Sequence, residues 1–181
     1  MKYVVFDCET TGLSPLSGDR ICEIGAVKLE GSRISDQYWH LVNPQREISY
    51  EAYMVNKIVP SMIKDAPTID EILPSFLGFI SGSKLAAYNA GFDISFLNSE
   101  LKACGFNPVE LKDAIDIYML ARKMLPNLNR YPLWNVARSL DISVVTTHRA
   151  LADAQLAAEV FIKLFSLGAG NLIGSASLDY R

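Results

Sequence analysis

The fold is decided by the opening stretch of the chain, residues 2–12, which reads KYVVFDCETTG. β-Branched and aromatic residues dominate up to Phe6 and predict a strand. Asp7 and Glu9 follow at its end, and because side chains two residues apart in a strand share a face, both carboxylates can reach one metal ion. Cys8 then points into the opposite layer. The Thr-Thr-Gly that follows offers hydroxyl groups and a close backbone approach to a ligand.

Outward from this stretch, the pattern of apolar and turn residues predicts three strands joined by short turns, then strands that alternate with helices. Thr68 and Glu71 form a predicted capping box, and Pro74 should kink its helix or end the helix's first segment. This order predicts an α/β fold with a mixed sheet of about five strands flanked by helices. The expected strands are 2–6, 21–29, 33–42, 85–88 and 114–117; the expected helices lie within 49–66, at 68–80 and 92–104, after the fifth strand to about 125, and at 133–140 and 150–167.

The composition is that of an ordinary globular domain, with 50% hydrophobic and 20% charged residues among 181. We expect one domain over residues 1–167 and a flexible tail or linker start, rich in Gly and Ser, over 168–181. Neither an apolar run long enough to span a membrane nor a signal-peptide pattern is found, so no membrane partner is expected. Three scattered cysteines, Cys8, Cys22 and Cys104, suggest neither disulfides nor a zinc site and fit a reducing cytoplasm.

The net charge of −3 and the pI of about 5.4 argue against non-specific binding of long nucleic acid, which depends on Lys and Arg. A short nucleic-acid substrate is still compatible with this charge. Divalent cations bound at an acidic site can be the largest local charges and reverse the local field.

Two later segments carry further chemistry. Residues 88–93, YNAGFD, place Asp93 at the start of a predicted helix, where an acidic residue also simply complements the helix dipole. Residues 148–153, HRALAD, place His148 before a helix and Asp153 inside it. Asp is a weak helix former, so its position in an alanine-rich helix indicates a special role. Four carboxylates and one imidazole match the needs of a two-metal phosphodiester hydrolase.

Taken in order, the three segments resemble the motifs of the DnaQ-like 3′–5′ exonucleases of the DEDDh class, whose third motif carries His. Within that family they most resemble the epsilon-type proofreading exonucleases of bacterial DNA polymerase III. The resemblance spans residues 3–167 and implies an RNase H-like fold. A haloacid dehalogenase-type phosphatase is the competing interpretation of Asp7, but that class needs Asp at the position of Glu9.

The resemblance also implies a mechanism. Asp7, Glu9, Asp93 and Asp153 would hold two divalent cations, Mg²⁺ or Mn²⁺, and His148 would accept the proton of the attacking water. Nucleoside 5′-monophosphates would then leave the 3′ end of single-stranded or frayed DNA. A DNA polymerase catalytic subunit is an expected partner. Asp116 resembles a further Asp of the family with a supporting role.

By motif position, the residues expected to contact substrate lie near the first two motifs and in the segment after the third strand: Thr10, Thr11, Gly12, Leu13, Val55, Asn56, Tyr88 and Phe92. Two departures from the family stand out. The usual Val-His-Gly-Ile-Thr is replaced by Val55-Asn56-Lys57-Ile58-Val59, so terminal-nucleotide contacts from this segment are in doubt. A sliding-clamp motif of the Gln-x-x-Leu-x-Leu-Phe kind is also missing after the last helix.

Two other functions stay open from the sequence. One is a 3′–5′ exoribonuclease of the same superfamily, because no residue here declares whether a 2′-hydroxyl is recognised. The other is a non-catalytic polymerase-associated module. The presence of all five residues, Asp7, Glu9, Asp93, His148 and Asp153, argues against the module.

Overall fold

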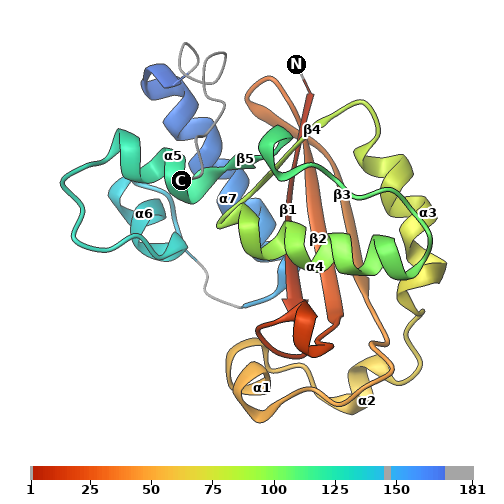
Figure 1. Ribbon diagram of the computed structural model, residues 1–181. Helices are drawn as coiled ribbons and strands as arrows, with labels where there is room; N and C mark the ends of the chain where they lie inside the picture. The colour runs from red at the N-terminus through yellow and green to blue at the C-terminus, as the bar shows by residue number, and fades with distance from the viewer. Residues whose placement is uncertain (1, 145–147, 170–181) are drawn as a thin grey trace.

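Five strands form one mixed sheet in the order β3-β2-β1-β4-β5, which confirms the predicted architecture. The computed structural model describes residues 2–144 and 148–169 (Figure 1). β1 pairs antiparallel with β2, and β2 with β3, whereas β4 runs parallel to both β1 and β5. The strands are β1 (Lys2–Thr10), β2 (Ile21–Glu30), β3 (Arg33–Leu41), β4 (Lys84–Ala87) and β5 (Ile115–Asp116).

Helices fill the connections between and after these strands. The α-helices are α1 (Tyr50–Asn56), α2 (Pro60–Ile63), α3 (Ile69–Ile80), α4 (Ala90–Ala103), α5 (Ile117–Met124), α6 (Leu133–Ser139) and α7 (Ala150–Leu164). Short 3₁₀ turns lie at η1 (Pro15–Ser17) and η2 (Leu111–Asp113), and a π-helical turn, η3 (Phe165–Ala169), follows α7.

The predicted capping box of α3 is present, with the Glu71 carboxylate accepting the N–H of Thr68 at 2.7 Å. The helix then continues through Pro74 to Ile80, so of the two predicted effects of this proline, a kink or an end to the first segment, the end does not occur. Leu73 and Phe76 on either side of the proline are fully buried, and this packing outweighs the loss of one backbone hydrogen bond.

Alternation along β1 divides the core between the two faces of the sheet. Val4 and Phe6 pack with residues of α3 and α4 on one face. Tyr3 and Val5 pack with residues of α5, α6 and α7 on the other. Figure 1 shows α4 crossing one face of the sheet, with α7 on the opposite side and its first turn near the end of β1. Asp7 continues the Tyr3–Val5 face, so it points toward α7.

Parts of two predictions lie outside the described residues: positions 145–147 of the loop before α7 and positions 170–181 of the tail. Within residues 2–144 and 148–169, no helix combines the length and the apolar character needed to cross a bilayer.

Candidate active site

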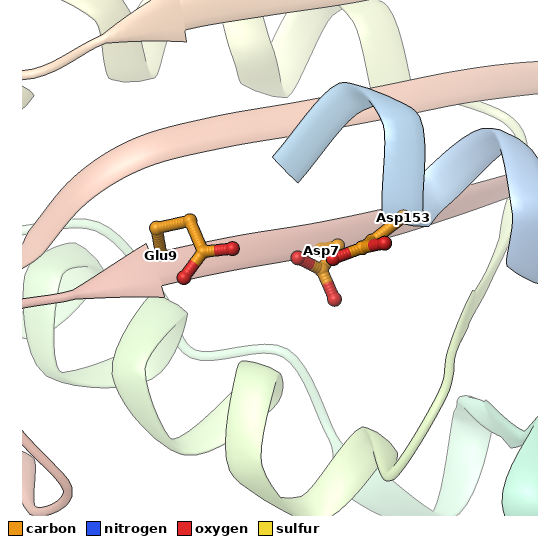
Figure 2. A group of neighbouring side chains, drawn as sticks. All are labelled: Asp7, Glu9 and Asp153. Atoms are coloured by element: carbon orange, nitrogen blue, oxygen red, sulfur yellow. The ribbon is translucent and has the colours of Figure 1, made fainter. Parts of the chain in front are cut away.

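Three carboxylates from two distant segments meet at the end of β1. Figure 2 shows Asp7 and Glu9 rising from β1 toward Asp153, which lies in the first turn of α7. One carboxylate oxygen from each of the three lies within 4.8 Å of the others. Such a group of oxygen donors suits a hard divalent cation such as Mg²⁺ or Mn²⁺.

A glycine on β2 allows α7 to come this close. Gly25 lies directly opposite Asp7 in the β1–β2 ladder. A Cβ atom built on Gly25 would lie 2.2 Å from the backbone nitrogen of Leu151 and 2.3 Å from the carbonyl carbon of Ala150. Gly25 was not among the predicted site residues, although a glycine inside a strand is a known signal of close backbone approach.

The fourth carboxylate, Asp93, reaches β1 from the first turn of α4. It is buried, and its Oδ1 accepts the backbone N–H of Cys8 at 3.0 Å. Asp93 is not among the three carboxylates within 4.8 Å, so it borders that group rather than joining it. Asp116 supports this region, because it caps α5 through the N–H of Met119 at 3.1 Å and also accepts backbone hydrogen bonds at the start of α4.

The four carboxyl groups resist ionisation in the metal-free protein. Burial, reinforced by the charge of Asp153, raises the pKa of Asp7 to about 8. Burial and the charge of Asp7 raise the pKa of Glu9 to about 9. Burial likewise raises the pKa values of Asp93 and Asp153 above their ordinary range. A bound cation would reverse this preference, since it favours the ionised form of each ligand.

His148 is exposed and stands two residues before the start of α7, with a left-handed backbone at φ 43°. A positive charge on its imidazole would lower the pKa of Asp153, against the effect of burial, so the ring lies within electrostatic range of that carboxylate. The ring is therefore accessible to water beside the acidic group. The other histidine, His40, lies on β3 and packs against Tyr38 in a tilted arrangement, with 4.9 Å between ring centroids.

A cleft of about 660 Å³ opens beside Glu9. Six of the eight residues predicted to contact substrate line it: Thr10, Gly12, Leu13, Val55, Asn56 and Phe92. Thr11 is instead fully buried, and its hydroxyl accepts the N–H of Arg20 at 3.0 Å. Tyr88 lines a separate hollow and donates its hydroxyl to the carbonyl of Tyr131 at 2.5 Å.

Asn56, which replaces the family's histidine, is buried and uses its amide within the protein. Its Nδ2 donates to the carbonyl of Thr10 at 3.3 Å, and its Oδ1 accepts the N–H of Ile58 at 3.0 Å. Asn56 thus ties α1 to the end of β1, where the cleft begins.

Comparison with known proteins agrees with this geometry. Residues 4–161 match the RNase_T family, described as Exonuclease, and the chain belongs to this family. It is 44% identical over 163 residues to a PolC-type DNA polymerase III of Caldanaerobacter subterraneus, covering 90% of this chain but only 11% of that polymerase. It is 39% identical over 170 residues to the DNA polymerase III epsilon subunit of Rickettsia felis, covering 91% of this chain and 74% of that subunit.

Among solved structures, the chain is similar to exonuclease X in complex with 5′-overhanging duplex DNA. The TM-score is 0.75 at 26% identity, and the match covers 92% of this chain and 93% of that one. These matches confirm the RNase H-like α/β fold and the predicted resemblance to epsilon-type DEDDh exonucleases.

Proposed function

We propose that this chain is a metal-dependent 3′–5′ exonuclease acting on the 3′ ends of single-stranded or frayed DNA. The observation that carries the proposal is the meeting of Asp7, Glu9 and Asp153 within 4.8 Å in a chain of the exonuclease family. Residues 1–167 would form the catalytic domain. The similarity to epsilon and PolC-type polymerase chains supports a role in proofreading or repair beside a DNA polymerase catalytic subunit.

Each candidate residue has a role in this proposal. Asp7, Glu9, Asp93 and Asp153 hold two divalent cations, Mg²⁺ or Mn²⁺. When bound, such cations stabilise the charge on the attacking and leaving oxygens of a phosphodiester. His148 accepts the proton of the attacking water at a ring nitrogen, which its exposed position permits. Hydrolysis breaks the bond between phosphorus and the 3′ oxygen and releases a nucleoside 5′-monophosphate.

The cleft beside Glu9 would receive the terminal nucleotide. Leu13 projects there with 84% of its surface exposed, and Phe92 offers an aromatic ring on the lining of the cleft. Stacking of bases on apolar and aromatic side chains tolerates any sequence, as an exonuclease requires. Thr10 and Gly12 also line this cleft.

A paired digestion with Mn²⁺ tests the proposal. One substrate is a 5′-labelled DNA oligonucleotide, the other is the same sequence as RNA, and His148→Ala is the control. We expect a 3′-shortening ladder on DNA that is weaker on RNA and reduced about 10²- to 10⁴-fold in the variant, the usual contribution of a general base. A ladder mainly on RNA would move the protein to RNA maturation or turnover. Folded protein without activity on either strand would favour a non-catalytic module.

A further inference from the structure

Glu23 is a fully buried carboxylate on β2 to which the mechanism above gives no role. It lies opposite Glu9 in the β1–β2 ladder, on the face that α7 covers. Its oxygens accept hydrogen bonds from Arg149, from the backbone N–H of Ala150 at 3.2 Å and from the indole N–H of Trp39. Burying a carboxylate costs free energy unless the group is paired with a cation and hydrogen-bonded. This set of donors meets that need and fixes the position of the Glu23 side chain.

Glu23 holds Arg149 and Ala150, the two residues that connect His148 to α7. The guanidinium of Arg149 donates to Glu23 through Nη2 at 2.7 Å and through Nε at 3.0 Å, a bidentate arrangement. Arg149 is the N-cap residue of α7 but makes no side-chain cap of its own. Glu23 therefore caps α7 from β2, by accepting the N–H of Ala150, and its negative charge is favourable at the N-terminus of the helix.

His148 comes directly before Arg149 and has a left-handed backbone conformation. A residue other than glycine adopts that conformation only at an energetic cost, so surrounding contacts must maintain it. Arg149 is the next residue, and its side chain is fixed on Glu23. Asp153 lies one turn further along, on α7, which also packs closely against Gly25.

We propose that Glu23 is a positioning residue that acts through Arg149 to hold His148 beside the carboxylate group; this inference rests on the proposed nuclease function. Glu23→Gln keeps the shape of the side chain but removes the charge that fixes the guanidinium. It should lower kcat about 10- to 100-fold, the effect usual for a residue that orients a catalytic group, with KM little changed.

The chain supplies a matched control in a second buried ion pair. Glu100 is also buried and accepts Arg20 Nε at 2.8 Å, Arg20 Nη2 at 2.7 Å and the N–H of Ile21 at 3.2 Å. Glu100→Gln therefore removes the same kind of interaction away from His148. Any loss it causes should be the same in the wild-type and His148→Ala backgrounds.

Glu23→Gln should behave differently from this control. If Glu23 acts through His148, adding Glu23→Gln to His148→Ala should cost less than about 2-fold beyond His148→Ala alone, because residues that act as a unit are not additive. If the double variant instead loses activity by the product of the two single losses, the inference is overturned and Glu23 has only a general structural role. Arg149→Lys, which keeps the charge but not the planar fork, should give an intermediate loss in a folded protein.

A second readout needs no substrate. The chain has two histidines, so the imidazole proton resonances of His148 can be assigned by their loss in His148→Ala. Glu23→Gln should shift and narrow them toward those of a free histidine, whereas Glu100→Gln should not. Unchanged His148 resonances in Glu23→Gln would overturn the inference. An inactive wild-type protein in which the resonances do respond would overturn the proposed function alone.

Discussion

The backbone N–H of Cys8 donates a 3.0 Å hydrogen bond to Oδ1 of Asp93, across 85 residues of sequence. The bond joins the end of β1, which carries Asp7 and Glu9, to the first turn of α4. Asp93 thus holds α4 to β1 beside the candidate metal site.

These two roles can be separated by substitution. Asp93→Asn keeps an oxygen that can accept the Cys8 N–H but removes the charge of a proposed metal ligand, so the melting temperature in EDTA should be unchanged or higher, while the rise on adding Mn²⁺ should shrink. Asp93→Ala also leaves the Cys8 N–H unpaired and should cost about 1–3 kcal/mol. Thermal melts with Mn²⁺ and with EDTA test this. Equal melting temperatures for the two variants in EDTA would contradict the structural role.

Metal binding should change how stability depends on pH. In the metal-free protein the pKa values of Asp7 and Glu9 are about 8 and about 9, against ordinary values of 3.8 and 4.5. The folded state therefore keeps protons that the unfolded state releases, so their contribution to the free energy of unfolding is lost progressively as pH rises from about 4 to about 9. With Mg²⁺ bound, the carboxylates are already ionised and this loss should be suppressed.

The gain in melting temperature from Mg²⁺ over EDTA should accordingly grow between pH 6 and pH 8. Asp7→Asn serves as the control, since it removes one of the carboxyl groups and should flatten the pH dependence in EDTA. Melting curves whose Mg²⁺ gain is constant across this range would count against the metal site.

Gly25→Ala should push α7 away from the sheet, because the new methyl group would overlap the backbone of Ala150 and Leu151. We expect a lower melting temperature and a loss of exonuclease activity of at least about 10-fold, since Asp153 moves away from Asp7. Gly78→Ala is the matched control: a Cβ there meets nothing within 4 Å, and the residue lies inside α3. It should be neutral or stabilise by about 0.4–1 kcal/mol. Full activity in Gly25→Ala would refute the close-contact role.

Asn56→Ala should destabilise the protein by about 1–3 kcal/mol, because the buried N–H of Ile58 loses its acceptor. Asn98→Ala is a matched control, since Asn98 also donates to one backbone carbonyl and accepts one backbone N–H, both of Val109, at 2.8 and 2.7 Å. Urea unfolding should give similar losses for both. Only Asn56→Ala should raise KM for a DNA oligonucleotide, because only Asn56 lies on the cleft.

Local pattern in the sequence was enough to predict much of this protein. Alternation along residues 2–12 predicted β1 with Asp7 and Glu9 on one face, and the Thr68–Glu71 spacing predicted the start of α3. These features depend on neighbours a few residues apart, whose relative positions the backbone geometry sets. The order of strands and helices was likewise enough to predict a mixed sheet.

Only the tertiary structure decided which distant residues meet. The contact of Gly25 with Leu151, the Glu23–Arg149 pair and the Cys8–Asp93 hydrogen bond all join segments far apart in the chain. Periodicity reports which face of an element is buried, but not which partner buries it. Glu23 is therefore only one of three charged residues in β2 until β2 and α7 are packed together, and that packing brings it into contact with Arg149 and Ala150, directly after His148.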